Sequence, residues 1–356
     1  AHEAFGRLPW KRLLEPAIRQ AREGVVISYD LAGLLKSRQE RMCRSEATCR
    51  YVYRKDGTPY EPGDLFVQRD LADTLERIAR HGADGFYQGK TAALIAAEME
   101  RGGGLVDEAS LARYEPVLRE PVTGTYRGYE IVTMPPPSSG GVHVIQMLNV
   151  LEHFPVRELG AGGADNVHLL AEAARLAYAD RSKHLGDPDY YDVPVAWLTS
   201  KDYAKELAST IDMAKARPSS DVEPGVAPPP ESPDTTHFSV IDASGMVVAT
   251  TTTLNFSFGS GIAVPGAGFL LNNEMDDFVS KPGVPNAFGL LGGEANSIAA
   301  GKRPLSSMTP TIVLDEGEPW FATGSPGGSR IITSVLQMIV NMVDHQMNMA
   351  EATAAP

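Results

Sequence analysis

The feature that most constrains this chain is an abrupt change of composition after residue 216. Residues 217–234 are rich in proline and serine and nearly lack large apolar side chains, which predicts a linker. They run directly into residues 235–242, whose pattern predicts a buried strand. A linker that ends at a threonine opening a strand is what a self-cleaving amidase precursor requires, because cleavage there would expose Thr235 as a new N-terminus. Thr235 is therefore the first candidate nucleophile.

Composition excludes several classes of function. The 356 residues are 43% hydrophobic and 22% charged, which is enough for a large core in one or two domains. A net charge of −13 without any basic block argues against nucleic-acid binding, since phosphate contacts need clustered Lys and Arg. No apolar run approaches the roughly 20 residues that a membrane helix needs. We therefore expect a small-molecule or peptide substrate and no membrane span.

The first 120 residues are predicted to be mainly helical. Apolar side chains recur at helical spacing over residues 8–24, 70–82 and 91–102, and each of these segments ends at a glycine. A short strand is expected at 128–134, before three prolines and two glycines that forbid helix and allow close backbone approach. Helices are then predicted at 143–154 and 165–184.

Beyond the linker the pattern changes to strands. A hairpin is predicted from 238–242 and 246–255, joined by a turn at 243–245. Two further short runs are punctuated by glycine and proline between 259 and 266, strands follow at 312–314 and 320–323, and an apolar helix is expected at 331–345. Helices followed by strands and a final helix indicate layered α and β elements, an α+β fold, without a βαβ repeat.

Cysteine and histidine give two open alternatives. Cys43 and Cys49 lie six residues apart, which suits one disulfide or two free thiols equally. The eight histidines form no His-x-x-x-His pair, so no metal site is predicted. His237 lies next to the threonines and is a conceivable base, but we favour a structural role for it in the strand.

A series of motifs, taken in order, resembles γ-glutamyltranspeptidases over essentially the whole chain. The resemblance implies the four-layer αββα sandwich of the N-terminal-nucleophile hydrolases. The motifs are residues 134–141 (MPPPSSGG), 178–181 (YADR), 235–240 (TTHFSV), 253–255 (TLN), 271–278 (LNNEMDDF), 302–308 (KRPLSSM) and 324–330 (GSPGGSR).

The resemblance also implies self-cleavage between Asp234 and Thr235. The products would be a large-subunit portion, 1–234, and a small-subunit portion, 235–356, which together form one heterodimeric catalytic domain. The chemistry is sensible on its own terms, because a threonine hydroxyl is a weak nucleophile and a free α-amine can serve as its base. One residue would then supply both groups.

Catalytic roles follow from the matching positions. Thr253 is expected to hydrogen-bond the nucleophile, and Gly327 and Gly328 to form an oxyanion hole with their backbone N–H groups. Residues 281–296 resemble the family's lid, with Phe288 where an aromatic side chain gates the pocket.

Substrate-binding roles follow in the same way. Asn255, Glu274 and Asp277 are expected to hold an α-ammonium group, and Ser306 and Ser307 to donate to an α-carboxylate. The implied reaction transfers the γ-glutamyl group of glutathione or a related amide to water or to an amino-acid or peptide acceptor, without a cofactor. A cephalosporin or glutaryl acylase with the same nucleophile is the alternative enzyme, and a non-catalytic truncated homologue is the alternative of another class.

Two further expectations come with the resemblance. The family is usually periplasmic or extracellular, which suits a bridge between Cys43 and Cys49. The family also carries a carboxylate-binding arginine in an earlier segment and closing strands after the position of Pro356, so the chain is expected to be a fragment of a longer enzyme.

Overall fold

The protein is an α+β structure, as the sequence predicts, and its chain folds into two compact units. The computed structural model describes residues 1–218, 222, 235–279, 281, 284 and 292–355. Unit 1 consists of Ala1–Leu118 and Phe258–Asn272, and unit 2 of Arg119–Ser257 and Asn273–Pro356. Both units contain residues from either side of the expected cleavage point, so that point is a boundary of the covalent chain and not of a compact unit.

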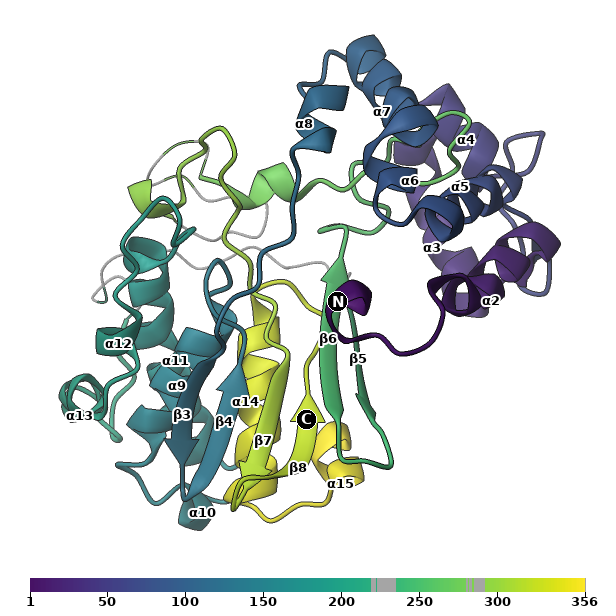
Figure 1. Cartoon of the computed structure of the whole chain (residues 1–356). Helices are drawn as coiled ribbons and strands as arrows, with labels where there is room; N and C mark the ends of the chain where they lie inside the picture. The colour runs from purple at the N-terminus through teal and green to yellow at the C-terminus, as the bar shows by residue number, and fades with distance from the viewer. Residues whose placement is uncertain (219–221, 223–234, 280, 282–283, 285–291, 356) are drawn as a thin grey trace. The chain divides into compact units, whose positions relative to one another are not determined.

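Unit 1 is mainly helical (Figure 1). The three helices predicted there are confirmed as α2, α5 and α7, with bounds that agree within two residues. The prediction missed α3 and α4, which begin after the N-capping side chains of Ser28 and Ser45. The elements are α1 (His2–Phe5), α2 (Trp10–Glu23), β1 (Val25–Val26), α3 (Tyr29–Met42), α4 (Glu46–Val52), β2 (Leu65–Phe66), α5 (Arg69–His81), α6 (Asp84–Tyr87), α7 (Gly89–Gly102) and α8 (Glu108–Ala112).

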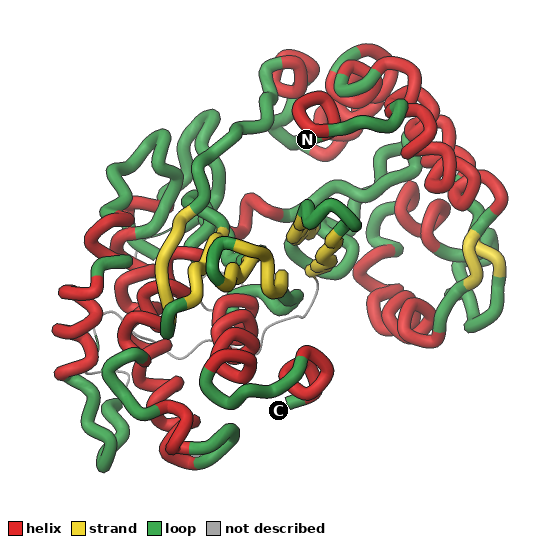
Figure 2. Tube along the Cα trace, turned by 60° about the horizontal axis from the view of Figure 1, so that its bottom comes forward, coloured by secondary structure: helices red, strands yellow, loops and turns green. Residues whose placement is uncertain are grey.

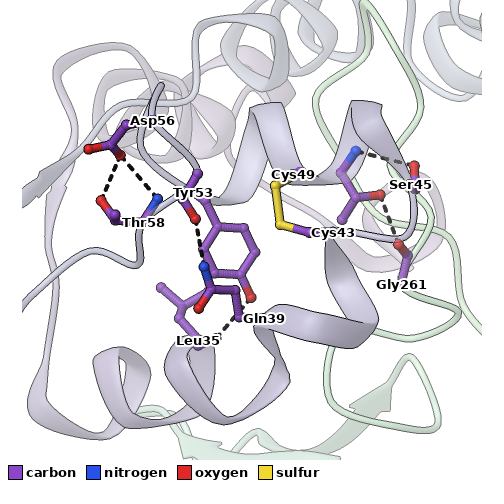
Figure 3. Close-up of a disulfide and its surroundings, with 11 residues drawn as sticks. Leu35, Gln39, Cys43, Ser45, Cys49, Tyr53, Asp56, Thr58 and Gly261 are labelled. Carbon is purple, nitrogen blue, oxygen red and sulfur yellow. Dashed lines mark hydrogen bonds between the residues drawn. A yellow bond between two sulfur atoms is a disulfide. The ribbon is translucent and has the colours of Figure 1, made fainter.

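Cys43 and Cys49 form a disulfide, which settles the alternative that the sequence left open (Figure 3). The bridge joins the residue after α3 to the middle of α4. Next to it, the Thr48 hydroxyl donates to the carbonyl of Gly261 at 2.8 Å and accepts the N–H of Ala263 at 2.9 Å. The disulfide therefore holds the helix turn that binds the returning segment 258–272.

Segment 258–272 contains no strand, and the prediction of two short strand runs there is wrong. The only pairing found among its described residues is an isolated bridge between Ala263 and Leu270. Val264 and Ala267 are fully buried instead, in a small cluster with Ile95 of α7. Their apolar side chains pack into the helical unit, which outweighs the local preference for extended structure.

Unit 2 is built on a four-stranded antiparallel sheet in the order β3-β4-β7-β8 (Figure 1). The predicted strands at 128–134, 312–314 and 320–323 are confirmed as β4, β7 and β8, whereas β3 was not predicted. Arg127 and Gly128 both have positive φ and form the two-residue turn of the β3–β4 hairpin. The strands are β3 (Val122–Tyr126), β4 (Tyr129–Thr133), β7 (Thr311–Asp315) and β8 (Glu318–Thr323).

Helices cover one face of this sheet. α9 (Gly140–Leu151) is buried at every position and packs on β3 and β4, with α11 (Ala164–His184), α13 (Lys201–Ser209) and α14 (Arg330–Val343) against it. α9 begins three residues earlier than predicted, at the two glycines. A Cβ on Gly140 would lie 2.0 Å from the hydroxyl of Thr309, so only glycine allows this contact. The short helices are α10 (Val156–Leu159), α12 (Val195–Leu198) and α15 (Met349–Ala354).

The hairpin predicted after the linker is present as β5 (Thr235–Ile241) and β6 (Val247–Thr253), but the prediction that the first strand is buried is wrong, because most residues of β5 are exposed. It forms a separate two-stranded sheet that lies against β7 and β8, and the two groups of strands are distinct in Figure 2. His237 hydrogen-bonds the hydroxyls of Thr251 and Ser239 at 2.8 and 3.0 Å, which agrees with a structural role.

Candidate active site

The register of the β5–β6 hairpin places Thr235 directly opposite Thr253. The hydroxyl of Thr235 donates to that of Thr253 across a distance of 3.4 Å. The oxygen of Thr253 also accepts the backbone N–H of Asn255 at 2.9 Å. The first residue of β5 is therefore half-buried and held beside a hydroxyl that is itself fixed by the backbone.

Asn255 follows β6 and has a positive φ of 75°, so the chain turns sharply there. Its side-chain amide donates to the carbonyl of Asn273 at 3.1 Å. The side chain of Asn273 accepts the N–H of Phe256 at 3.0 Å, and its own N–H donates to Leu254 at 3.1 Å. These bonds hold the end of β6 against the start of the one-turn helix η2 (Glu274–Asp277).

η2 presents two carboxylates three residues apart. Burial raises the pKa of Glu274. Burial, followed by the charge and hydrogen bond of Glu274, raises the pKa of Asp277 to about 8, while the positive charge of Arg181 lowers it. Two neighbouring carboxylates that are both desolvated cannot easily ionise together, so the pair retains a proton near neutral pH.

Ser306 and Ser307 lie on an extended segment that the Pro-Pro-Pro-Ser-Ser-Gly-Gly loop supports. Ser138 bridges to Ser306 as an isolated parallel pair, and the N–H of Ser306 donates to the carbonyl of Pro137 at 2.9 Å. The hydroxyl of Ser139 donates to the carbonyl of Ser306 at 2.9 Å. The loop before α9 therefore fixes the backbone that carries both serines.

Gly327 and Gly328 form the turn that precedes α14. Their φ values are 129° and 56°, which only glycine adopts without strain in this region. The backbone N–H groups of both residues have no hydrogen-bond acceptor within the described part of the protein. Such N–H groups can donate hydrogen bonds to an oxygen atom of a bound substrate.

Eight of the predicted site residues line one pocket, of about 390 Å³ including the space open to solvent. Gly327 is the neighbour of a lining residue but does not line the pocket itself, and Asp234 and Phe288 lie outside the described residues. The eight are Thr235, Thr253, Asn255, Glu274, Asp277, Ser306, Ser307 and Gly328.

Arg181 also lines the pocket, and no role was predicted for it. It is only 4% exposed on α11, where it follows the buried residues Ala173 and Ala177 at intervals of four. An arginine that continues a buried stripe is the sequence signal that could have identified it. The other unpredicted lining residues are Leu305, Met308, Ser329 and Ile331.

The described residues contain no group of three or more His, Cys, Asp or Glu side chains placed to hold a metal ion. In the part of the chain that the structure covers, no helix combines the length and apolar character needed to cross a bilayer.

The pocket thus groups Thr235, at the start of a strand, with paired acidic and hydroxyl side chains, and comparison with known proteins shows the family to which the chain belongs. The family model for gamma-glutamyltranspeptidase matches residues 1–356. The glutathione hydrolase proenzyme of Escherichia coli strain K12 is 50% identical over 356 residues, covering 100% of this chain and 61% of that protein. The acylase ACY 1 proenzyme of Pseudomonas sp. strain SE83 is 43% identical, covering 99% and 60%.

Solved structures give the same picture. Helicobacter pylori gamma-glutamyltranspeptidase matches with a TM-score of 0.62 and 45% identity, over 63% of this chain and 64% of that one. Cephalosporin acylase from Bacillus halodurans matches with a TM-score of 0.82 and 26% identity, over 98% and 61%. The fold is therefore the α+β sandwich of the N-terminal-nucleophile hydrolases.

The chain belongs to the gamma-glutamyltranspeptidase family. It spans about three fifths of the length of the curated relatives described above, 61% and 60%.

Proposed function

We propose that this chain forms the catalytic part of a self-processing enzyme that cleaves γ-glutamyl amides such as glutathione. One observation carries the proposal: Thr235 shares its pocket with two carboxylates, Glu274 and Asp277, and with two serine hydroxyls, Ser306 and Ser307. An ammonium group offers only donors and a carboxylate only acceptors, so this pairing suits the α-amino-acid end of a γ-glutamyl group.

In the acylation step, the Thr235 hydroxyl attacks the γ-carbonyl carbon. Its proton passes to the free α-amine of the same residue and then to the leaving amine as the C–N bond breaks. The N–H groups of Gly327 and Gly328 would stabilise the tetrahedral oxygen, and one such donor is typically worth about 10²–10³ in rate. Thr253, 3.4 Å from the attacking oxygen, orients it.

In the second step, water or an acceptor amine attacks the γ-glutamyl ester on Thr235. The same α-amine takes a proton from the attacking group and returns it to the threonine oxygen as the ester C–O bond breaks. Hydrolysis and transfer therefore share one intermediate, and the identity of the nucleophile decides between them.

Maturation would cut the chain between Asp234 and Thr235 and leave a heterodimer. The contacts within unit 2 support a stable association of the two products. β4, which precedes the cut, pairs with β7, which follows it, over Glu130–Thr133 and Thr311–Leu314. Because α9 and α14 also share one hydrophobic core, separation would expose a large apolar surface.

We further propose a periplasmic or extracellular location. The Cys43–Cys49 disulfide supports this, because such bonds persist in oxidising compartments.

Two matched substrates test the proposal against an acylase. Glutaryl anilide lacks the α-amine of γ-glutamyl anilide but keeps its carboxylate. We expect the whole natural protein to favour the γ-glutamyl compound, and Asp277→Ala to lose that preference while it still self-cleaves. Faster turnover of the glutaryl compound by the unmodified protein would instead support an acylase, and no turnover of either would support a non-catalytic homologue.

A denaturing gel tests the nucleophile. The unmodified protein and Thr235→Ser should each give two bands, because a serine keeps the hydroxyl, whereas Thr235→Ala should remain a single band. Thr253→Ala serves as a control that keeps the nucleophile but slows both maturation and turnover. Splitting of Thr235→Ala at the same bond would eliminate Thr235 as the nucleophile.

A further inference from the structure

Arg181 is a buried cation in the wall of the pocket that the proposed chemistry does not yet use. It projects from α11 and its residue is only 4% exposed. Its Nε donates to the hydroxyl of Ser139 at 2.8 Å, and its Nη2 donates to the hydroxyl of Ser307 at 3.1 Å. Burying a guanidinium is costly, so both bonds are worth more here than on the surface.

These bonds decide in which direction the serine hydroxyls can donate their hydrogens. A guanidinium has donors only, so the oxygens of Ser139 and Ser307 must act as acceptors toward it. The hydrogen of Ser307 must then point away from Arg181. The oxygen of Ser306 accepts the N–H of Met308 at 3.0 Å, which turns its hydrogen away from the backbone in the same manner. Both hydroxyls are thereby left to donate.

The Nε of Arg181 acts on the backbone of Ser306 indirectly, through the hydroxyl of Ser139. Ser139 accepts from Arg181 and passes its own hydrogen to the carbonyl of Ser306 at 2.9 Å. One side chain therefore controls the hydroxyl of Ser307 directly and the position of Ser306 through a relay. Its positive charge also adds to the attraction for an anion in the pocket.

We propose that Arg181 is a positioning residue that prepares Ser306 and Ser307 as hydrogen-bond donors for the α-carboxylate of the substrate. This deepens the proposed γ-glutamyl activity and rests on it. An arginine with only a structural role would hold α11 against the segment that carries the serines. Its loss would weaken the binding of all substrates equally. A positioning arginine acts only on substrates that bear the carboxylate, which separates the two roles.

The test compares γ-glutamyl anilide with 4-aminobutanoyl anilide, which lacks only the α-carboxylate. The variant is Arg181→Met in the whole natural protein. We expect KM for the γ-glutamyl compound to rise about 10- to 100-fold, the range for losing a hydrogen bond to a charged group, with a much smaller change in kcat. KM for the 4-aminobutanoyl compound should rise far less, because for this substrate only the loss of the Arg181 charge near Asp277 affects the ammonium site.

A matched control lies on the same helix. Arg175 pairs with Glu172, so Arg175→Met makes the same chemical change on α11 outside the pocket lining. This variant should leave the ratio of the KM values for the two substrates unchanged. The variant that combines Arg181→Met with Ser307→Ala should have a KM for γ-glutamyl anilide little higher than that of Ser307→Ala alone, because the arginine acts through that hydroxyl.

Equal losses on both substrates, or fully additive effects in the double variant, would overturn the proposal. If Arg181→Met does not fold, Arg181→Lys and Ser139→Ala provide the same comparison, since each removes part of the hydrogen-bonding fork. An unmodified protein that ignores γ-glutamyl anilide would refute the proposed function. An active protein whose substrate ratio is insensitive to Arg181 would refute only the inference.

Discussion

Replacing Asp277 by asparagine should stabilise the protein and weaken its binding of substrate. Burial and the neighbouring carboxylate of Glu274 raise the pKa of Asp277 from 3.8 to about 8. At pH 7 the folded protein therefore holds a proton that the unfolded chain has released. An asparagine needs no proton and can donate its amide hydrogen to Glu274 in place of the shared proton.

The size of the gain follows from the proton linkage. Folding at pH 7 must protonate a group whose ordinary pKa lies about 3.2 units lower, and at about 1.36 kcal/mol per unit this costs at most about 4 kcal/mol. Asp277 keeps partial contact with solvent, which reduces the penalty. We expect Asp277→Asn to raise the free energy of unfolding by about 1–3 kcal/mol at pH 7.

The sign of the pH dependence is fixed by the same shift. A carboxyl group with a raised pKa contributes its full stability below pH 4 and loses it as the pH rises toward 8. The advantage of Asp277→Asn should therefore be small near pH 4.5 and largest near pH 8. In the substrate assay, KM of the unmodified protein should fall as the pH approaches 8, because the ionised pair binds an ammonium group more tightly.

Urea unfolding at pH 4.5, 6 and 8 provides the measurement. Both proteins should carry Thr235→Ala, so that a single uncleaved chain unfolds, and Asp202→Asn on an exposed turn of α13 is the control for adding an amide. A destabilised Asp277→Asn, or a stability difference that is the same at all three pH values, would refute the reasoning about the carboxylate pair.

Three other changes probe the scaffold. Removing the disulfide with Cys43→Ser and Cys49→Ser should lower the free energy of unfolding by about 2 kcal/mol, read from urea midpoints with and without reductant; an unchanged midpoint would argue against a structural bond. Gly140→Ala should cost about 1–3 kcal/mol and raise KM, because its Cβ would lie 2.0 Å from a threonine hydroxyl, whereas Gly33→Ala, with open space around it, should be neutral or stabilising. Leu148→Ala in the fully buried α9 should cost about 2–5 kcal/mol in thermal or urea unfolding, and a loss below 1 kcal/mol would show that the core is loosely packed there.

The sequence predicted the start of β5 well, because a sharp change in composition coincides with it. The hairpin pattern predicted two paired strands, and their register brings Thr235 opposite Thr253, whereas the roles expected for Thr253 and Asn255 came from the motif resemblance. The motif resemblance predicted that Glu274 and Ser306 belong to one site, which no local sequence pattern could indicate. Their meeting depends on tertiary contacts far apart in the chain.

The failures have physical causes as well. The strand β3 was missed because Gly124 interrupts its alternation, although a Cβ there would lie 2.7 Å from Ile145 and glycine is needed for packing. The runs around Val264 were taken for strands because apolar, β-branched residues favour extended structure, yet they are buried among helices. Arg181 ends the motif at 178–181, but no role was assigned to it, because its contacts with Ser139 and Ser307 depend on the tertiary fold.

The path of the chain between Ser257 and Asn273 has a consequence for how members of this family can diversify. The chain leaves unit 2 and re-enters it at points joined by hydrogen bonds, 3.0 Å between Phe256 and Asn273 and 3.1 Å between Leu254 and Asn273. Sites with adjacent entry and exit tolerate insertion and excision best. Insertions at the exposed turn of Pro265 and Gly266 could therefore vary the excursion, while Asn255 and Glu274, the proposed ligands for the amino group, keep their supports.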